Sequence, residues 1–314
     1  MSIDAAETSA SRLRNTMVDQ LVRWRSLRTT QVEAAMRAVP RHLFVPDASI
    51  EKAYAQDGVV THRGTDGRPR SMASAPAVVA QMLEQLDVRP GHRVLEIGAG
   101  TGYNAALLAH LVGPGGRVTS IDIDEDVVEG ARSGLAAVGC DNVHLICGDG
   151  EYGHLGDAPY ERLVVTAGAW DVPPAWTDQL TVDGRIVVPL RVRGLTRSVA
   201  LERENGFLRS RSMRYCGFIP MRGAGHCPEP TLKLSDDIEV YLRLDDRRSA
   251  DAESLRNALD HPAHHTWLGV TASEEELGHF EFWLATMDGW SLRVRPTRQG
   301  TGRSSRRSDP QVGP

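Results

Sequence analysis

A glycine-rich turn, Gly98-Ala99-Gly100-Thr101-Gly102, is the segment of this 314-residue chain whose composition points most directly to chemistry. It follows the apolar run VLEI and precedes a segment of helical character. Glycines let a backbone approach a ligand without a Cβ clash, and a helix N-terminus favours a negatively charged group such as a carboxylate. Tyr103 stands where dinucleotide-binding turns carry their third glycine, which disfavours a nicotinamide cofactor.

Two carboxylates follow this turn in the order of a nucleoside site. Asp122 ends the next predicted strand about twenty residues further on, where an acid can accept hydrogen bonds from both ribose hydroxyls. The alternative is a solvated acid at a strand end. Asp149, followed by Gly150, comes after the third strand, where a carboxylate could meet an adenine amino group. A Gly-Asp-Gly turn alone carries little information, but in this order it predicts S-adenosylmethionine as the cofactor.

Glu96 lies inside the apolar strand before the turn, where an unpaired carboxylate would be costly to bury. It is either a satisfied core carboxylate or an acceptor for the amino group of the cofactor. We favour the second alternative.

Alternating strands and helices surround these residues. Strands are predicted at 93–97, 117–123, 142–148, 162–168 and 184–190, and helices at 102–112 and 125–138. This alternation is typical of an α/β, doubly wound, Rossmann-like sheet of the class I methyltransferase type. A hairpin after residue 190 is expected to complete the sheet edge. Apolar spacing over 11–39 predicts two further helices, and 76–86 a third.

Composition limits the classes of partner. The formal net charge is −5, from 36 basic and 41 acidic residues, which does not suggest a nucleic-acid partner held by a broad basic face. The N-terminus has no apolar signal region, and no stretch reaches the roughly 18 apolar residues of a membrane helix. We therefore expect a cytoplasmic monomer without membrane contact. The four cysteines have no zinc or redox spacing and are interpreted as packing thiols.

Composition also divides the chain. We predict an N-terminal helical, substrate-side segment at 1–75, a cofactor-binding core at 76–227, an accessory module at 228–292 and a disordered tail at 293–314. His264 and His265 lack a third ligand at metal-site spacing, so no metal site is expected. The aromatic residues of the module are expected to form a small core rather than a peptide groove. They are Trp267, Phe280, Phe282, Trp283 and Trp290.

Motifs beyond the glycine turn resemble those of the protein-L-isoaspartate O-methyltransferase family. In chain order they are MVDQL, AMRAVPRHLFVP, AY at 53–54, SMASAP at 71–76, VLEIGAGTGYNAALLA, GDGEYG and FIPM at 218–221. The similarity runs from about residue 12 to 223. The N-terminal motifs are not part of the general methyltransferase core, so they make the resemblance specific.

The resemblance implies methylation of a carboxylate of an aspartyl or isoaspartyl residue in a peptide, followed by loss of methanol to give a succinimide. The serine of the family's T-I-S-x-P motif lies at the reacting carboxylate and matches Ser74, the expected catalytic residue. Met72 replaces the threonine, and Ser71 adds a second hydroxyl that we assign to the cofactor-binding set. Ser74 could also cap the following helix. Arg68 and Arg70, in the polar segment before it, could meet acidic peptide groups or belong to a solvated loop.

The chain continues for about ninety residues after FIPM, including HHTWLGVT and HFEFWLA. This extension resembles a branch of the family associated with ribosomally made, modified peptides such as lanthipeptides and graspetides, in which an ordinary aspartate is converted to aspartimide or isoaspartate. We therefore favour a dedicated peptide substrate. Housekeeping isoaspartate repair is the second hypothesis, and a non-catalytic scaffold that binds the cofactor or a partner is the third. Failure to bind S-adenosylmethionine would favour the scaffold.

Overall fold

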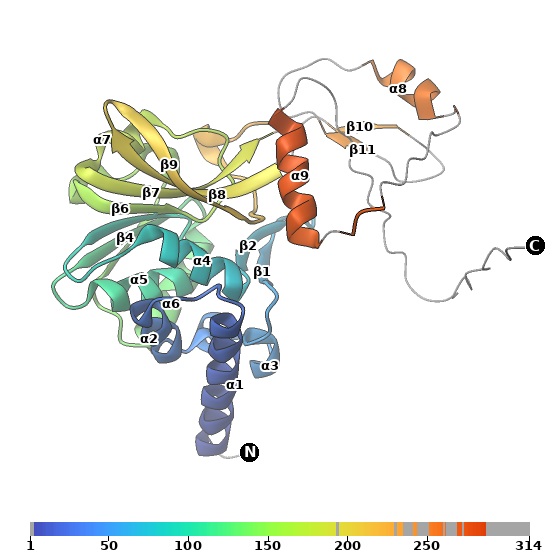
Figure 1. Cartoon of the computed structure of the whole chain (residues 1–314). Helices are drawn as coiled ribbons and strands as arrows, with labels where there is room; N and C mark the ends of the chain where they lie inside the picture. Colours follow the sequence, from blue (N-terminus) through green and yellow to red (C-terminus); the bar gives the residue numbers. More distant parts are fainter. Residues whose placement is uncertain are drawn as a thin grey trace, which may run out of the picture. The chain divides into compact units, whose positions relative to one another are not determined.

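The computed structural model describes residues 3–192, 195–228, 231–234, 241–243, 251–259, 261, 269–271 and 273–286. The chain divides into two compact units, Met1–Pro228 and Glu229–Pro314 (Figure 1). The predicted tail at 293–314 lies outside the described residues. None of the described helices is both long enough and apolar enough to cross a membrane.

A seven-stranded sheet forms the centre of the first unit. Its order is β5 (Val143–Cys147), β4 (Arg117–Asp122), β3 (Arg93–Ile97), β6 (Tyr160–Val165), β7 (Leu180–Val192), β8 (Leu195–Glu204) and β9 (Phe207–Tyr215). The strands from β5 to β7 are parallel, and β8 and β9 are antiparallel additions. This confirms the predicted Rossmann-like α/β class and the hairpin at the sheet edge.

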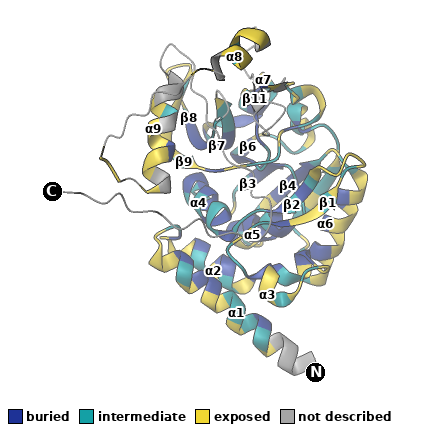
Figure 2. Cartoon of the chain, turned by 90° about the vertical axis from the view of Figure 1, so that its right-hand side faces the viewer, coloured by how far each residue is buried: buried dark blue, intermediate teal, exposed yellow. Residues whose placement is uncertain are grey.

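Helices cover the sheet on one face. They are α1 (Ile3–Arg23), α2 (Thr30–Ala38), α4 (Pro76–Leu86), α5 (Tyr103–Val112) and α6 (Glu125–Ala137), with the short α3 (Ile50–Ala53) beside them. Met17 of α1, Met36 of α2 and Leu83 of α4 belong to one buried cluster that includes Val94 and Val118 of the sheet. Buried residues concentrate in the strands between the layers (Figure 2). The N-terminal helices therefore share their core with the sheet.

The opposite face has its own apolar cluster, which includes Leu95, Leu163 and Ile186. Trp176 of the short helix α7 (Pro174–Asp178) is fully buried there and donates its indole N–H to the carbonyl of Gly150 at 2.8 Å. The packing of α7 thus supports the turn that carries Asp149.

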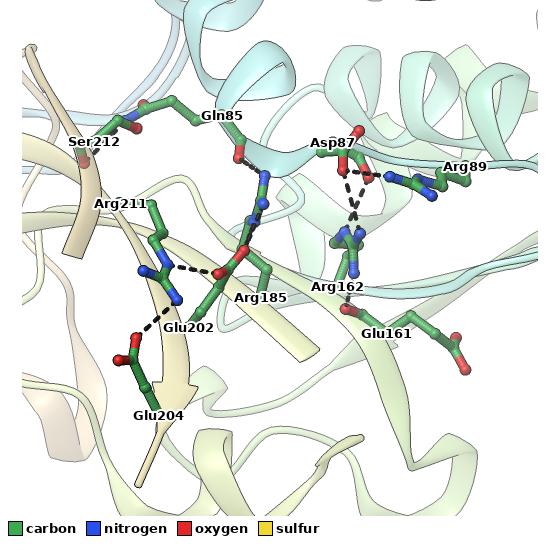
Figure 3. Close-up of polar contacts among 10 residues, drawn as sticks. All are labelled: Gln85, Asp87, Arg89, Glu161, Arg162, Arg185, Glu202, Glu204, Arg211 and Ser212. Carbon is green, nitrogen blue, oxygen red and sulfur yellow. Dashed lines mark hydrogen bonds and ion pairs between the residues drawn. The ribbon is translucent and has the colours of Figure 1, made fainter. Parts of the chain in front are cut away.

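A polar network joins the end of α4 to the strands (Figure 3). The Gln85 amide donates to the Ser212 hydroxyl at 3.0 Å, and the Gln85 carbonyl accepts from Arg185 at 2.9 Å. Arg185 also donates to Glu202 at 2.8 Å. Because buried polar groups need partners, these bonds fix the C-terminal end of α4 against β7, β8 and β9.

The polar segment before Ser74 is a β-hairpin, which the sequence interpretation did not anticipate. β1 (Val59–Arg63) and β2 (Pro69–Ala73) pair in antiparallel register. Gly67 has a φ of +74° in the connecting turn, where its carbonyl accepts from Arg63 at 2.9 Å. The strands are short and mostly polar, so their pattern resembles a loop.

The second unit contains the antiparallel pair β10 (Thr231–Lys233) and β11 (Tyr241–Arg243) and the helices α8 (Ala252–Leu259) and α9 (Glu274–Thr286). On α9, Phe280 and Trp283 are 51% and 52% exposed and stack with ring centroids 5.8 Å apart. The small-core interpretation is therefore wrong for these two rings. Trp267, Trp290, His264 and His265 lie outside the described residues.

Candidate active site

A cavity at the carboxyl ends of the parallel strands gathers the predicted site residues. Its lining includes Ser71, Ser74, Gly98, Ala99, Gly100, Thr101, Asp122, Asp149 and Gly150. These residues come from β2, from the segment before α4, from the end of β4 and from the turns after β3 and β5. Ligands of open α/β sheets bind at this edge. The fold therefore brings the N-terminal serines to the glycine turn, from which they are well separated in sequence.

The glycine turn leaves no room for side chains at its base. Gly98 has a φ of +99°, and a Cβ added there would lie 2.5 Å from the Thr166 hydroxyl. The amide N–H groups of Gly98 and Ala99 both donate to the Ile121 carbonyl, at 2.7 and 2.9 Å. These bonds fix the turn against β4, with Gly100 and Thr101 along the cavity.

Asp122 ends β4 with its side chain only 12% exposed. One carboxylate oxygen accepts from the Gly100 amide at 3.0 Å and the other from the Asp124 amide at 3.3 Å. Burial raises the pKa of Asp122, and the two backbone hydrogen bonds and the charge of Arg222 oppose that rise. A carboxylate has about four acceptor sites, so these contacts leave capacity for a diol in the cavity.

Asp149 holds two loops together. Its carboxylate accepts from the amide of Glu151 at 3.0 Å and from the amide of Ala224 at 2.7 Å. Gly150 is buried, and a Cβ there would lie 2.4 Å from a methyl group of Ile97. Asp149 thus connects the turn after β5 to the segment that follows FIPM.

Glu96 and Gly102 do not line the cavity, which corrects two residues of the predicted binding set. Glu96 is fully buried, and its two oxygens accept from Asn104 at 2.7 Å and from Ser120 at 2.5 Å. Burial raises its pKa to about 7 despite these bonds. The satisfied-carboxylate alternative is therefore the better description, and it is Asn104 that reaches the cavity wall.

Gly102 serves the turn instead of the ligand. Its φ is +83°, and a Cβ at this position would lie 3.0 Å from the Ala131 carbonyl of α6. Glycine is therefore required by close packing between α5 and α6. The sequence signal for glycine was correct, but the atom that approaches the backbone belongs to the protein.

Ser74 lies between β2 and α4 and lines the cavity half-buried. The helix begins at Pro76 with Ala75 as its N-cap residue, and no side-chain hydrogen bond caps it. The helix-cap alternative for Ser74 is therefore wrong. The Ser74 carbonyl accepts from the guanidinium of Arg41 at 2.8 Å, which fixes the backbone and leaves the hydroxyl at the cavity.

Arg41 is a positioning residue that sequence reasoning missed. It is fully buried, it also donates to the carbonyls of Ala53 and Ala73 at 2.8 and 3.3 Å, and its guanidinium lies 5.0 Å from the centre of the Tyr103 ring. Burial lowers its pKa, and nearby tyrosines oppose that shift. Only the motif PRHLFVP, which contains it, could have pointed to this role.

The FIPM segment closes the cavity from the other side. Phe218, Ile219 and Met221 line it, and the Met221 amide donates to the Gly168 carbonyl at 2.9 Å. Arg222 follows, with its guanidinium 2.9 Å from an oxygen of Asp124 and 4.0 Å from Asp122. No local pattern marks Arg222, because its partners lie far away in sequence.

The two arginines of the hairpin differ in place. Arg70 lines the cavity and pairs with Asp66 at 3.0 Å, whereas Arg68 is exposed in the turn. The solvated-loop interpretation fits Arg68. Arg70 is close enough to the cavity to contact a bound group.

Comparison with known proteins agrees with this geometry. The family model described as protein-L-isoaspartate(D-aspartate) O-methyltransferase matches residues 11–225. The protein-L-isoaspartate O-methyltransferase of Methanopyrus kandleri is 40% identical over 221 residues, covering 70% of this chain and 95% of that protein. That of Methanoregula boonei is 41% identical over 210 residues, covering 67% and 93%. The chain belongs to this family.

Solved structures agree. A protein-L-isoaspartate O-methyltransferase superposes with a TM-score of 0.63 at 27% identity, covering 70% of this chain and 72% of that one. A Plasmodium falciparum protein in complex with S-adenosyl-L-homocysteine has a TM-score of 0.58 at 18% identity, covering 67% and 98%, a likeness of fold. The protein is an S-adenosylmethionine-dependent methyltransferase of the isoaspartate O-methyltransferase family. The family match ends just before the second unit begins.

Proposed function

We propose that this enzyme methylates a carboxylate of isoaspartyl residues in polypeptides, with Ser74 orienting the acceptor. The observation that supports it most is that Ser74 shares one cavity with Gly98, Asp122 and Asp149. An acceptor and an adenosyl cofactor could therefore occupy one enclosure. The names of the related proteins point to the same substrate class.

The cofactor assignment follows from the donor set. Asp122 would accept from the ribose hydroxyls and Asp149 from the adenine amino group, and the backbone of the turn, including Ala99 and Thr101, would lie along the amino-acid portion. At Gly100, where φ is +53°, an added Cβ would meet only the Ser71 hydroxyl, at 3.8 Å, so the backbone there stays open to a ligand in the cavity. Ser71, buried beside Gly100, supports the turn from the hairpin side.

When bound, S-adenosylmethionine supplies an activated methyl group on a sulfonium. The acceptor needs no general base, because a carboxylate is already ionised at neutral pH. The residues of the chain have to align the acceptor oxygen and exclude water. The Ser74 hydroxyl would donate to the non-reacting carboxylate oxygen, while Met72, Phe218 and Met221 provide apolar walls.

The later chemistry belongs to the peptide. The backbone nitrogen of the next residue attacks the ester carbonyl and methanol leaves, so a succinimide forms. This step requires no residue of the cavity. Hydrolysis of that ring would return aspartate or isoaspartate.

A second candidate is methylation of aspartate in one dedicated, ribosomally made peptide. It is favoured by the unit beyond residue 228, which lies outside the family match and carries the half-exposed pair Phe280 and Trp283. Repair must accept many unrelated sequences and gains little from a surface that selects one partner.

One experiment tests both candidates. The purified enzyme and S-adenosylmethionine are incubated with an isoaspartyl peptide, with its aspartyl counterpart and with a constrained precursor peptide, and each is followed by mass spectrometry. We expect methyl ester or succinimide on the isoaspartyl peptide. Turnover of the precursor alone would favour the second candidate. Cofactor binding without transfer to any of the three peptides would contradict both candidates.

A further inference from the structure

Two histidines and an aspartate form a cluster outside the cavity. His144 lies on β5, His154 in the loop that follows, and Asp157 ends the short 3-10 helix Leu155–Asp157. The Nδ1 atom of His144 is 2.7 Å from Oδ2 of Asp157, and Nε2 of His154 is 3.7 Å from the same oxygen. All three candidate ligand atoms lie within 4.8 Å of one another.

These distances suit a shared cation. Bonds from zinc to nitrogen or oxygen are about 2.0 to 2.2 Å, so neighbouring ligand atoms of a tetrahedral site lie about 3.4 Å apart. The two distances to Asp157, 2.7 and 3.7 Å, fall on either side of that value, and the two histidine nitrogens lie within 4.8 Å of each other. Two imidazoles and one carboxylate are a ligand set that zinc accepts, with the remaining position open to water.

The carboxylate is held as the common ligand. Asp157 is 19% exposed, and its Oδ2 atom accepts from the Thr119 hydroxyl at 2.9 Å. Thr119 pairs with His144 on the adjacent strand, so both side chains leave the same face of the sheet.

His154 is held equally well. Its amide donates to Gln179 at 2.8 Å, and its carbonyl accepts from the Tyr160 hydroxyl at 2.7 Å. A Cβ at position 156 would lie 2.8 Å from Nε2 of His154, so Gly156 gives the ring space to turn toward Asp157. These bonds fix the backbone of His154, and the Thr119 hydroxyl is the kind of partner that a ligating carboxylate has in metal sites.

We propose that His144, His154 and Asp157 bind a divalent cation of the Zn²⁺ class. The site replaces the sequence expectation of no metal, which considered only His264 and His265. It is separate from the cavity, since none of the three ligands lines it. In sequence, His144 comes before and His154 after the turn of Asp149 and Gly150. A cation bound to both histidines would therefore close a short loop that carries two residues of the cavity lining. The competing interpretation is a His–Asp ion pair without metal.

The test uses full-length enzyme without an affinity tag, stripped of metal and titrated with Zn²⁺ by calorimetry. We compare the wild type with His154→Asn and His144→Gln, and with His110→Asn, an exposed histidine of α5, as matched control. The wild type and the control should bind one more equivalent of Zn²⁺ than the two variants, or bind it at least about tenfold more tightly. Loss of a hydrogen-bond partner of a metal ligand already lowers metal affinity by about ten- to a hundredfold, so loss of a ligand should do at least as much. Bound Co²⁺ should show no thiolate band, which excludes the exposed Cys147.

A second measurement avoids variants that misfold. In the wild type, Zn²⁺ should protect His144 and His154 from diethyl pyrocarbonate while His110 stays reactive, as mapped by mass spectrometry. Equal Zn²⁺ affinity and stoichiometry in all four proteins, or modification of His144 and His154 that Zn²⁺ does not change, would overturn the proposal and leave the ion pair.

Discussion

The two walls of the cavity are built by different means. The strand-end wall, residues 97–101, 103–104 and 121–123, comes from one strand-helix-strand unit and offers backbone groups and the Asp122 carboxylate. The covering wall, residues 70–74 and 218–222, comes from two segments far apart in the chain and offers hydroxyls, apolar side chains and arginines. One wall depends on local geometry, and the other depends on long-range packing.

This difference separates two tasks. The strand-end wall is suited to a cofactor of fixed chemistry, because strand ends and glycine turns set its shape. The covering wall is suited to the acceptor, because its position depends on β1 and β2, on Arg41 and on the loop held by Asp149. Variants in one wall should therefore leave the task of the other largely intact, and the following predictions test that separation.

The largest effect is expected at the strand-end wall. Asp122→Ala removes the proposed acceptor for the two ribose hydroxyl groups, and each charge-assisted hydrogen bond contributes about 1.5 to 3 kcal/mol. Affinity for S-adenosylhomocysteine should fall roughly a hundredfold or more, as measured by calorimetry. Asp141→Ala, at an exposed position after α6, is the matched control. Unchanged affinity in a folded Asp122→Ala protein would remove this residue from the site.

Glu96 accepts a hydrogen bond from Asn104 of that wall, and its protonation makes the free energy of unfolding depend on pH. Its pKa is raised to about 7 by burial, so the folded state retains a proton that the unfolded chain releases. The resulting stabilisation is present below the ordinary glutamate pKa, about 4.3, and is lost as pH rises through about 7, an effect of up to about 3 kcal/mol. Glu96→Gln should flatten the decline in the free energy of unfolding between pH 5 and pH 7.

The measurement is urea unfolding at several pH values. Glu51→Gln, at an exposed position, is the control and should keep the wild-type slope. Identical slopes in the Glu96→Gln variant and the wild type would show that Glu96 is not the titrating group.

A smaller effect is expected at the covering wall. Ser74→Ala removes the proposed hydrogen bond to the acceptor carboxylate. Its loss should cost about 1.5 to 3 kcal/mol, or about ten- to a hundredfold in kcat/KM. Affinity for S-adenosylhomocysteine should stay within about twofold, and Ser74→Thr should recover part of the rate. Steady-state kinetics with an isoaspartyl peptide measures this. A normal rate per folded molecule would exclude Ser74 from the acceptor site.

The strand-end wall could be predicted from the sequence more completely than the covering wall. The sheet, its parallel core and the turns of Gly98, Asp122 and Asp149 could be predicted because each depends on a short pattern. Ser74 was found through its resemblance to a family motif. The sequence could not assign Glu96, because hydrogen bonds from Asn104 and Ser120 become visible only when three elements pack together. Arg222 and the β1–β2 hairpin were missed for the same reason, since their contacts span the chain or lack a strong local pattern.

The smallest effect on cofactor binding is expected from removing the second unit. The family match ends at residue 225, and every residue named above as lining the cavity lies before residue 223. Every residue of the two hydrophobic clusters beside the sheet lies in the first unit. Leu234 of the second unit is buried but belongs to neither cluster. A chain ending near residue 228 should therefore fold, bind S-adenosylhomocysteine within about twofold of full length and methylate isoaspartyl peptides.

If the second unit selects a dedicated substrate, turnover of a constrained precursor should fall at least tenfold in the same protein. Phe280→Ala with Trp283→Ala in the full chain should reproduce that loss, whereas Val270→Ala, another exposed apolar position of this unit, should not. Equal loss with every peptide would show that the two units are needed together for catalysis, and no loss with any would favour general repair.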